Sequence, residues 1–165
     1  MEKKYNYKSC SSLFGYSAKV HIRFKGQCQL CKCGGGNPVD FDLWRQMTVE
    51  HLIGKSQGGY LKQILIFVEE FFPMLNKDDI KKLAIKIDEK NTITCCQFCN
   101  STTCRYPYDK SMKDLFIEAQ NNNIDLIEHI DKECQNILKK KQEDVKNKLS
   151  IIKEAFKNEV LSRIN

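Results

Sequence analysis

Two short cysteine pairs are the first residues of this sequence whose types and spacing suggest chemistry. Cys28 and Cys31 are separated by two residues, in CQLC, and Cys96 and Cys99 repeat that spacing in CQFC. Two thiolates at this spacing can bind one side of a zinc ion, and a second pair completes a tetrahedral site. A closed site of this kind is structural, because it leaves no coordination position for water or substrate. We therefore expect a structural Zn²⁺ that joins two distant segments.

The choice among the nine cysteines stays open at this level. Cys33 could replace Cys31, and Cys95 is adjacent to Cys96, but the matched pairs are preferred because each has the same loop geometry. A second site that uses Cys33 and Cys104 is a less favoured alternative. The odd cysteine count and an N-terminus without the apolar stretch of a signal peptide favour metal ligation over disulfides. We thus expect a cytoplasmic protein.

A second group of chemically capable residues begins in MTVEHLIGKSQGG, residues 47–59, where Glu50 and His51 interrupt an apolar run before a glycine-rich loop. A neutral imidazole with a pKa near 6.5 can accept a proton from water at neutral pH. Carboxylate and amide oxygens are hard ligands suited to Mg²⁺, and Asn100 directly follows the last paired cysteine. Since neighbouring side chains of a strand point to opposite faces, one shared site requires the strand to end or bend here.

Taken in order along the chain, these motifs resemble the HNH endonuclease family, which has the ββα-metal fold. The resemblance is carried by CQLC, TVEHLIGKSQGG and NTITCCQFCN. It covers about a third of the chain, in residues 20–59 and 88–105. Each motif alone is weak evidence, whereas the ordered combination is specific.

The resemblance implies a role for each matching residue. His51 would be the general base that activates water, and Glu50 and Asn100 would hold a single catalytic Mg²⁺ or Mn²⁺. Asn91 would brace the loop and help to orient the base. The structural zinc site would be formed by the paired cysteines, Cys28, Cys31, Cys96 and Cys99.

Three positions depart from the family pattern. Gly54 stands where Pro is frequent, Glu50 stands where Asp is commoner, and Thr103 stands where Lys often follows the second cysteine pair. The last departure leaves Lys55 and Arg105 as the candidate phosphate contacts. None of the three removes a group that the chemistry requires.

The implied function is a metal-dependent endonuclease that hydrolyses DNA phosphodiester bonds, in a restriction or defence role, and leaves 5′-phosphate and 3′-hydroxyl ends. Double-stranded DNA is the expected partner. The net charge of +6, most of it in residues 1–109, fits a polyanion, and Lys81, Lys82 and Lys86 are further candidate contacts. The alternative is a non-catalytic, zinc-stabilised module that binds nucleic acid, in which the carboxylate and the imidazole have no chemical role.

Short strands and helices must position these side chains. Residues 39–53 are rich in β-formers, and we expect two short strands joined near Arg45–Gln46. From residue 60 to 87 apolar residues recur at helical spacing. Pro73 interrupts that pattern and Asn76 is a candidate N-cap, which predicts an inserted helical hairpin.

The expected fold class is α+β, with a small ββα-metal core joined by the four-cysteine zinc site. Residues 1–109 would form the nuclease domain, and residues 110–165 a helical extension packed on it. A short helix should follow the second cysteine pair and end before Pro107. The apolar stripes of the extension allow a homodimer contact or docking of a partner protein. No apolar run approaches the ~20 residues of a membrane span, so we expect no membrane partner.

Overall fold

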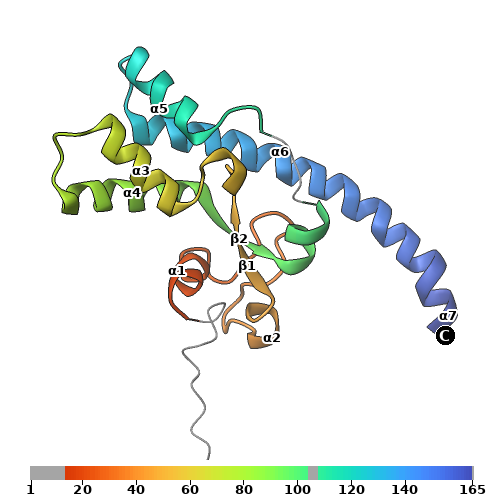
Figure 1. Ribbon diagram of the computed structural model, residues 1–165. Helices are drawn as coiled ribbons and strands as arrows, with labels where there is room; N and C mark the ends of the chain where they lie inside the picture. Colours follow the sequence, from red (N-terminus) through yellow and green to blue (C-terminus); the bar gives the residue numbers. More distant parts are fainter. Residues whose placement is uncertain (1–13, 104–107, 165) are drawn as a thin grey trace, which may run out of the picture.

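The two segments that pair as strands are rich in β-branched residues, which pack well on a pleated surface. In the computed structural model, which describes residues 14–103 and 108–164, β1 (Met47–His51) and β2 (Thr92–Cys96) form a two-stranded antiparallel sheet. Met47 lies opposite Cys96, and His51 lies opposite Thr92. Helices make up most of the rest (Figure 1), so the described part of the chain is α+β, as the sequence predicts.

The segment before β1 is helical where a strand is expected. α2 (Phe41–Trp44) is a single turn that begins at Asp40, whose carboxylate accepts a hydrogen bond of 2.8 Å from the Leu43 backbone N–H. The prediction of two strands joined near Arg45–Gln46 is therefore wrong for the first of them. An aspartate at this position favours a helical turn over an extended strand, because its carboxylate accepts from a backbone N–H that would otherwise have no partner at the start of the turn.

Two helices are inserted between the strands. α3 (Leu61–Phe71) ends before Pro73, and α4 (Lys77–Asn91) begins at Asn76, whose side chain accepts a backbone hydrogen bond of 2.9 Å. The hairpin and its N-cap are thus confirmed, but α4 extends beyond the expected end at residue 87. Its last residue leads directly into β2, so Asn91 lies at the corner between helix and strand.

Three shorter helical elements border the sheet. α1 (Tyr16–Arg23) contacts both strands, and η2 (Lys55–Gln57) is a 3₁₀ turn in the loop after β1. η3 (Cys99–Thr103) follows β2 as a π-helical turn, where a short helix is expected. Since η3 contacts both β2 and the long C-terminal helix, it connects the second cysteine pair to that helix.

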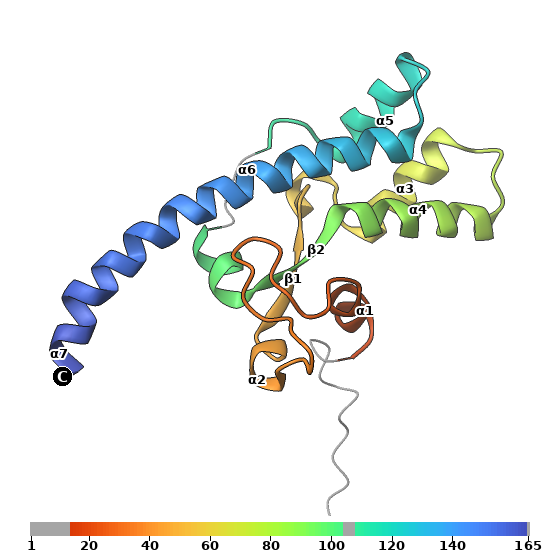
Figure 2. The same cartoon turned by 180° about the vertical axis from the view of Figure 1, so that it is seen from behind.

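The C-terminal part consists of α5 (Met112–Asn121), α6 (Leu126–Ala155), η4 (Phe156–Leu161) and α7 (Ser162–Ile164). Ser111 and Asp114 form a reciprocal capping box at the start of α5. α6 packs against α4 and α5, passes the sheet, and then projects away from the body of the molecule (Figures 1 and 2). No helix within the described ranges is both long and apolar enough to cross a bilayer.

One hydrophobic core connects the sheet, the inserted hairpin and the first half of α6. Its largest buried side chains include Met47, Ile53, Ile64, Val68, Ile87, Met112, Leu115, Phe116, Ile130 and Ile137. Burial along α6 ends near Val145, and the side chains of Ile151, Phe156 and Ile164 are exposed farther on. The first half of α6 therefore packs on the core, while the projecting end carries an exposed apolar stripe.

Candidate metal centre and active site

Four cysteine sulfurs converge where the first cysteine loop meets the end of β2. The Sγ atoms of Cys28, Cys31, Cys96 and Cys99 all lie within 4.8 Å of one another. The Sγ atoms of Cys31 and Cys96 are 3.8 Å apart. Four thiolates bound at ~2.3 Å around a tetrahedral Zn²⁺ would have a similar spacing. The described residues thus contain a group that can hold a metal ion, and its soft sulfur ligands fit a structural zinc.

The matched pairs, rather than Cys33 or Cys95, make up this group. Cys104, which the alternative site would need, lies outside the described residues. Hydrogen bonds from the thiols of Cys95 and Cys96 lower the pKa of the Cys28 thiol far below its ordinary value. Cys28 therefore favours the thiolate, which is the form that binds zinc. Burial and the neighbouring cysteines raise the pKa of the Cys96 and Cys99 thiols, so these two must lose their protons when a metal binds.

Backbone geometry shapes the first cysteine loop. The Cys28 N–H donates to the Cys33 carbonyl at 2.9 Å, and Lys32 has a positive φ of 65°. Gly34 also has a positive φ, of 77°, and a Cβ there would lie 2.5 Å from the Gly26 carbonyl oxygen. Gln29 N–H donates to the Thr94 carbonyl at 2.8 Å, so the loop is attached directly to β2. This attachment sets the two cysteine pairs face to face.

Asn100 directly follows Cys99, the last cysteine of this group, and its side chain reaches the face of β1 that carries Glu50. Its Nδ2 donates to Thr48 Oγ1 at 2.9 Å, and that hydroxyl donates to the Cys95 carbonyl at 2.9 Å. Thr48 and Glu50 are two residues apart on a strand, so their side chains share one face. Because Nδ2 is used for Thr48, Oδ1 is the Asn100 atom suited to a metal.

A lysine from α6 contacts the Glu50 carboxylate. Lys141 Nζ lies 2.5 Å from Glu50 Oε1, and the two side chains are only 3% and 15% exposed. The next residue, Gln142, donates from Nε2 to the Gln29 carbonyl at 2.8 Å. α6 therefore contacts both the first cysteine loop and the carboxylate expected to bind the catalytic metal, and it supplies that carboxylate with a cation of its own.

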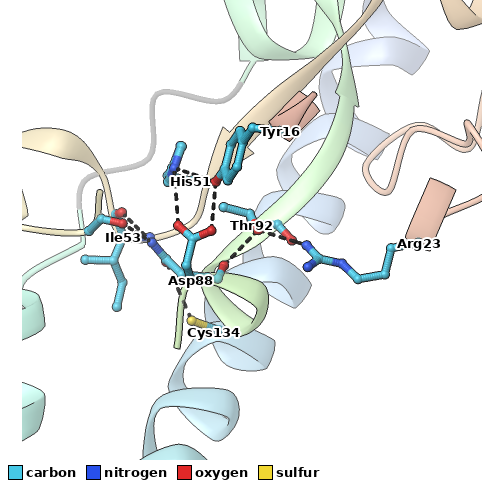
Figure 3. Close-up of polar contacts among 9 residues, drawn as sticks. Tyr16, Arg23, His51, Ile53, Asp88, Thr92 and Cys134 are labelled. Atoms are coloured by element: carbon cyan, nitrogen blue, oxygen red, sulfur yellow. Dashed lines mark hydrogen bonds and ion pairs between the residues drawn. The ribbon is translucent and has the colours of Figure 1, made fainter. Parts of the chain in front are cut away.

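His51 points to the opposite face of the sheet, toward α1 and α4 (Figure 3). Its Nε2 is 3.4 Å from the Tyr16 hydroxyl and 3.9 Å from Asp88 Oδ1. The imidazole stacks on the Tyr60 ring with a centroid distance of 4.1 Å. Burial lowers the pKa of His51 to about 4, so the ring is neutral at pH 7. Glu50 and His51 thus leave β1 in different directions, as alternation along a strand requires.

The Asn91 side chain ties the loop after His51 into one conformation. Its Oδ1 accepts from Ile53 N–H at 2.7 Å, and its Nδ2 donates to the carbonyls of Ile53 and Gly59 at 3.0 and 2.8 Å. Its backbone carbonyl accepts from Leu52 N–H at 2.9 Å. Asn91 is fully buried, so its hydrogen bonds attach the loop after β1 to the start of β2.

Of the two candidate phosphate contacts, only one lies among the described residues. Lys55 is exposed in η2, next to the braced loop, and Arg105 lies outside the described residues. A further basic feature is a groove of about 440 Å³ between the first cysteine loop and α6. Its floor contains Leu30, Val145 and Leu149, and the exposed lysines on its rim are Lys32, Lys146 and Lys153.

The candidate site is also contacted by three residues that the sequence analysis does not predict: Tyr16, Asp88 and Lys141. For two of these residues the sequence pattern itself indicates an unusual position. Lys141 falls on the buried stripe of α6 between Ile137 and Val145, where an apolar residue is expected. Asp88 falls on the apolar face of α4 beside Ile87. A charged residue on a helix stripe that is otherwise apolar marks a buried ion pair or a polar site.

Compared with known proteins, the chain matches no family model, no curated protein and no solved structure. The likeness to HNH endonucleases consequently rests on the ordered sequence motifs alone and stays a prediction.

Proposed function

We propose that the protein is a metal-dependent endonuclease of the HNH type that hydrolyses double-stranded DNA, in a restriction or defence role. The observation that carries the proposal is the position of Asn100. It directly follows Cys99, and its amide is held against Thr48 on the Glu50 face of β1. The turn that carries the second cysteine pair thus holds the Asn100 amide against the face that carries a carboxylate. In this proposal β1, β2 and η3 form the ββα-metal core.

The ligand chemistry fits a hard divalent cation. Glu50 offers a carboxylate and Asn100 an amide oxygen, which are ligands that Mg²⁺ and Mn²⁺ accept together with water and phosphate oxygens. A cation bound there supplies charge stabilisation to the phosphate in the transition state. Lys141 must then move from Glu50 or share it, because its ammonium group lies at the ligand oxygen.

The remaining chemistry falls to His51 and the loop that follows it. The neutral imidazole accepts a proton from a water molecule, and the resulting hydroxide attacks phosphorus. The bond from phosphorus to the 3′ oxygen breaks, which leaves 5′-phosphate and 3′-hydroxyl ends. Asn91 keeps the loop after His51 in place through its bonds to Ile53 and Gly59. Since His51 and Glu50 leave β1 on opposite faces, the scissile phosphate must lie at the end of the strand, where both can reach it.

Phosphate contacts would come from exposed lysines. Lys55 lies in the loop after β1, and the rim lysines of the groove beside α6 (Lys32, Lys146 and Lys153) lie on the side of the first cysteine loop. Lysines at such positions neutralise backbone phosphates and make binding salt-dependent. The net charge of +6 is consistent with this partner.

A homodimer formed through the projecting C-terminal helices is part of the proposal. Phe156, Val160 and Ile164 recur at helical spacing and are exposed, and a second copy would cover them. Two copies would also supply two active sites, one for each DNA strand. Light scattering behind a size-exclusion column tests this: a monomer at micromolar concentration that stays a monomer on DNA would contradict it.

The second candidate is a non-catalytic, zinc-stabilised module that binds nucleic acid. The observation in its favour is the Lys141–Glu50 pair, which neutralises the carboxylate without a divalent ion. Such a module would keep the cysteine cluster and the basic groove. It would have no use for the proton-accepting nitrogen of His51.

A cleavage assay separates the two candidates. Purified protein is incubated with supercoiled plasmid DNA and Mn²⁺ or Mg²⁺, and the ends are identified by ligation and sequencing. We expect nicking or linearisation that His51→Ala and Glu50→Ala each abolish and that His129→Gln, a change at a histidine outside the site, retains. DNA binding without cleavage would support the module. Cleavage by His51→Ala at the wild-type rate would rule out the proposed mechanism.

A further inference from the structure

A buried polar cluster surrounds the side of His51 that faces away from Glu50. Tyr16 of α1 donates its hydroxyl hydrogen to Asp88 Oδ2 at 2.9 Å. The Asp88 side chain is 6% exposed, and its Oδ1 has no hydrogen-bond partner among the described residues. His51 Nε2 lies 3.9 Å from this oxygen, which is within ion-pair distance but too far for a hydrogen bond. Figure 3 shows Tyr16 and His51 converging on this carboxylate.

The hydrogen positions around Nε2 follow from the donor and acceptor inventory of the three groups. Tyr16 has one hydroxyl hydrogen, and Asp88 Oδ2 already receives it, so the phenol oxygen offers His51 a lone pair. An ionised Asp88 carboxylate has acceptors only. Burial raises the pKa of Asp88 above its ordinary value, and the Tyr16 hydrogen bond and the Arg23 charge offset only part of that rise. The Tyr16 oxygen, 3.4 Å from Nε2, can therefore only accept from it, which favours the tautomer with the proton on Nε2.

The rest of the cluster holds this arrangement in place. Arg23, also on α1, donates from Nη2 to the carbonyl and the hydroxyl of Thr92, at 2.8 Å each. The Thr92 hydroxyl in turn donates to the Asp88 carbonyl at 2.7 Å. Stacking on Tyr60 restrains the plane of the His51 ring. Three elements thus supply the cluster: α4 the carboxylate, α1 the phenol and β1 the imidazole. Hydrogen bonds connect α1 and α4 and hold the cluster together.

We infer that Asp88 and Tyr16 are positioning residues for His51: the Tyr16 oxygen, oriented by its hydrogen bond to Asp88, holds the proton on Nε2, so that Nδ1 is the nitrogen that accepts the proton of water. The inference rests on the proposed function. An orienting carboxylate fixes both the ring direction and the tautomer of a catalytic histidine, and it stabilises the imidazolium that forms during the reaction. Asp88 lies on α4 and acts through its hydrogen bond to Tyr16. The inserted hairpin thus contributes a residue to the surroundings of His51.

Nitrogen NMR tests the tautomer without any need for activity. Long-range ¹H–¹⁵N correlation spectra of the full chain at neutral pH distinguish protonated from unprotonated imidazole nitrogens, and His21 and His129 serve as internal references. We expect His51 to show a single tautomer with the proton on Nε2 in the wild type. Asp88→Asn and Tyr16→Phe should each produce averaging between tautomers. Glu89→Gln, the same change of charge at the adjacent exposed residue of α4, should leave the spectrum unaltered. A proton on Nδ1 in the wild type would overturn the inference.

Kinetics test whether the positioning matters to the reaction. A positioned acid or base contributes about 10²- to 10⁴-fold to a rate, so we expect Asp88→Asn to lower kcat by at least about tenfold with KM changed less than about twofold. Thermal unfolding of each variant checks that the fold persists. An active wild type whose kcat is unaffected by Asp88→Asn contradicts the positioning role while the proposed function stands. An inactive wild type with the expected NMR result contradicts the proposed function while the tautomer assignment stands.

Discussion

Lys141 and Glu50, 91 residues apart in sequence, form an ion pair of 2.5 Å at the face of β1 where the candidate catalytic metal would bind. The lysine is 3% exposed, so its charge is compensated by the carboxylate rather than by water. A divalent ion at Glu50 would have to compete with this ammonium group. The affinity of this site for a divalent ion therefore depends on α6, which supplies the lysine, as well as on the ligands themselves.

Replacing Lys141 should strengthen metal binding. In Lys141→Met the competing cation is gone, and we expect the Kd for Mn²⁺, measured by calorimetry, to fall by about tenfold, which corresponds to ~1.4 kcal/mol. Without metal the same variant should lose about 3 kcal/mol of unfolding free energy, because it leaves a buried carboxylate unpaired. Lys148→Met, which removes a lysine from a partly exposed pair on the same helix, is the matched control. Weaker Mn²⁺ binding by Lys141→Met would show that the lysine assists the site.

Zinc should be required for the fold around the sheet. The four sulfurs join a loop at residues 28–31 to a turn at residues 96–99, and binding energy of such a site is folding energy. We expect one zinc per chain by atomic emission, and loss of helical circular dichroism on treatment with a strong chelator. Cys96→Ser should behave like the chelated protein. Cys33→Ser should keep its zinc, and loss of metal from that variant would move the site to the alternative ligand set.

Gly59 should be irreplaceable in the braced loop. A Cβ at this position would lie 1.7 Å from the Ile53 carbonyl oxygen and 2.9 Å from Asn91 Nδ2. Gly59→Ala must displace the backbone or the brace, and we expect it to cost more than about 1 kcal/mol of unfolding free energy. Gly54→Ala is the control in the same loop, because its φ is −76° and the nearest atom to a Cβ is 4.0 Å away. Denaturant unfolding of both variants measures the difference, and equal stabilities would contradict the predicted clash.

The groove beside the first cysteine loop should contact DNA. Changing Lys32, Lys146 and Lys153 together to Gln should lower affinity for duplex DNA and reduce the slope of log K against log salt by about 2.7, from ~0.9 for each lost phosphate contact. Lys81, Lys82 and Lys86 on α4, changed to Gln together, give the same loss of charge on the other candidate surface. Fluorescence anisotropy at several salt concentrations compares the two triples. A larger effect of the α4 triple would place the DNA on the inserted hairpin instead.

Much of the local structure was predictable because local spacing determines it. The two Cys-x-x-Cys pairs, the helical period from residue 60 onward and the Asn76 cap each depend on residues within a few positions of one another. The α+β class follows from the same patterns. The error at residues 39–43 was also local, since a single capping interaction of Asp40 outweighed an alternation of apolar residues.

The sequence by itself determined which residues have chemically useful groups, and only the tertiary structure decided which of them meet. Glu50 and His51 are neighbours in the chain, yet strand geometry sends one toward α6 and the other toward α1 and α4. Their actual partners, Lys141, Asp88 and Tyr16, come from helices whose placement depends on packing across the whole core. Such long-range contacts are set by the burial of many apolar side chains at once, so no short motif encodes them.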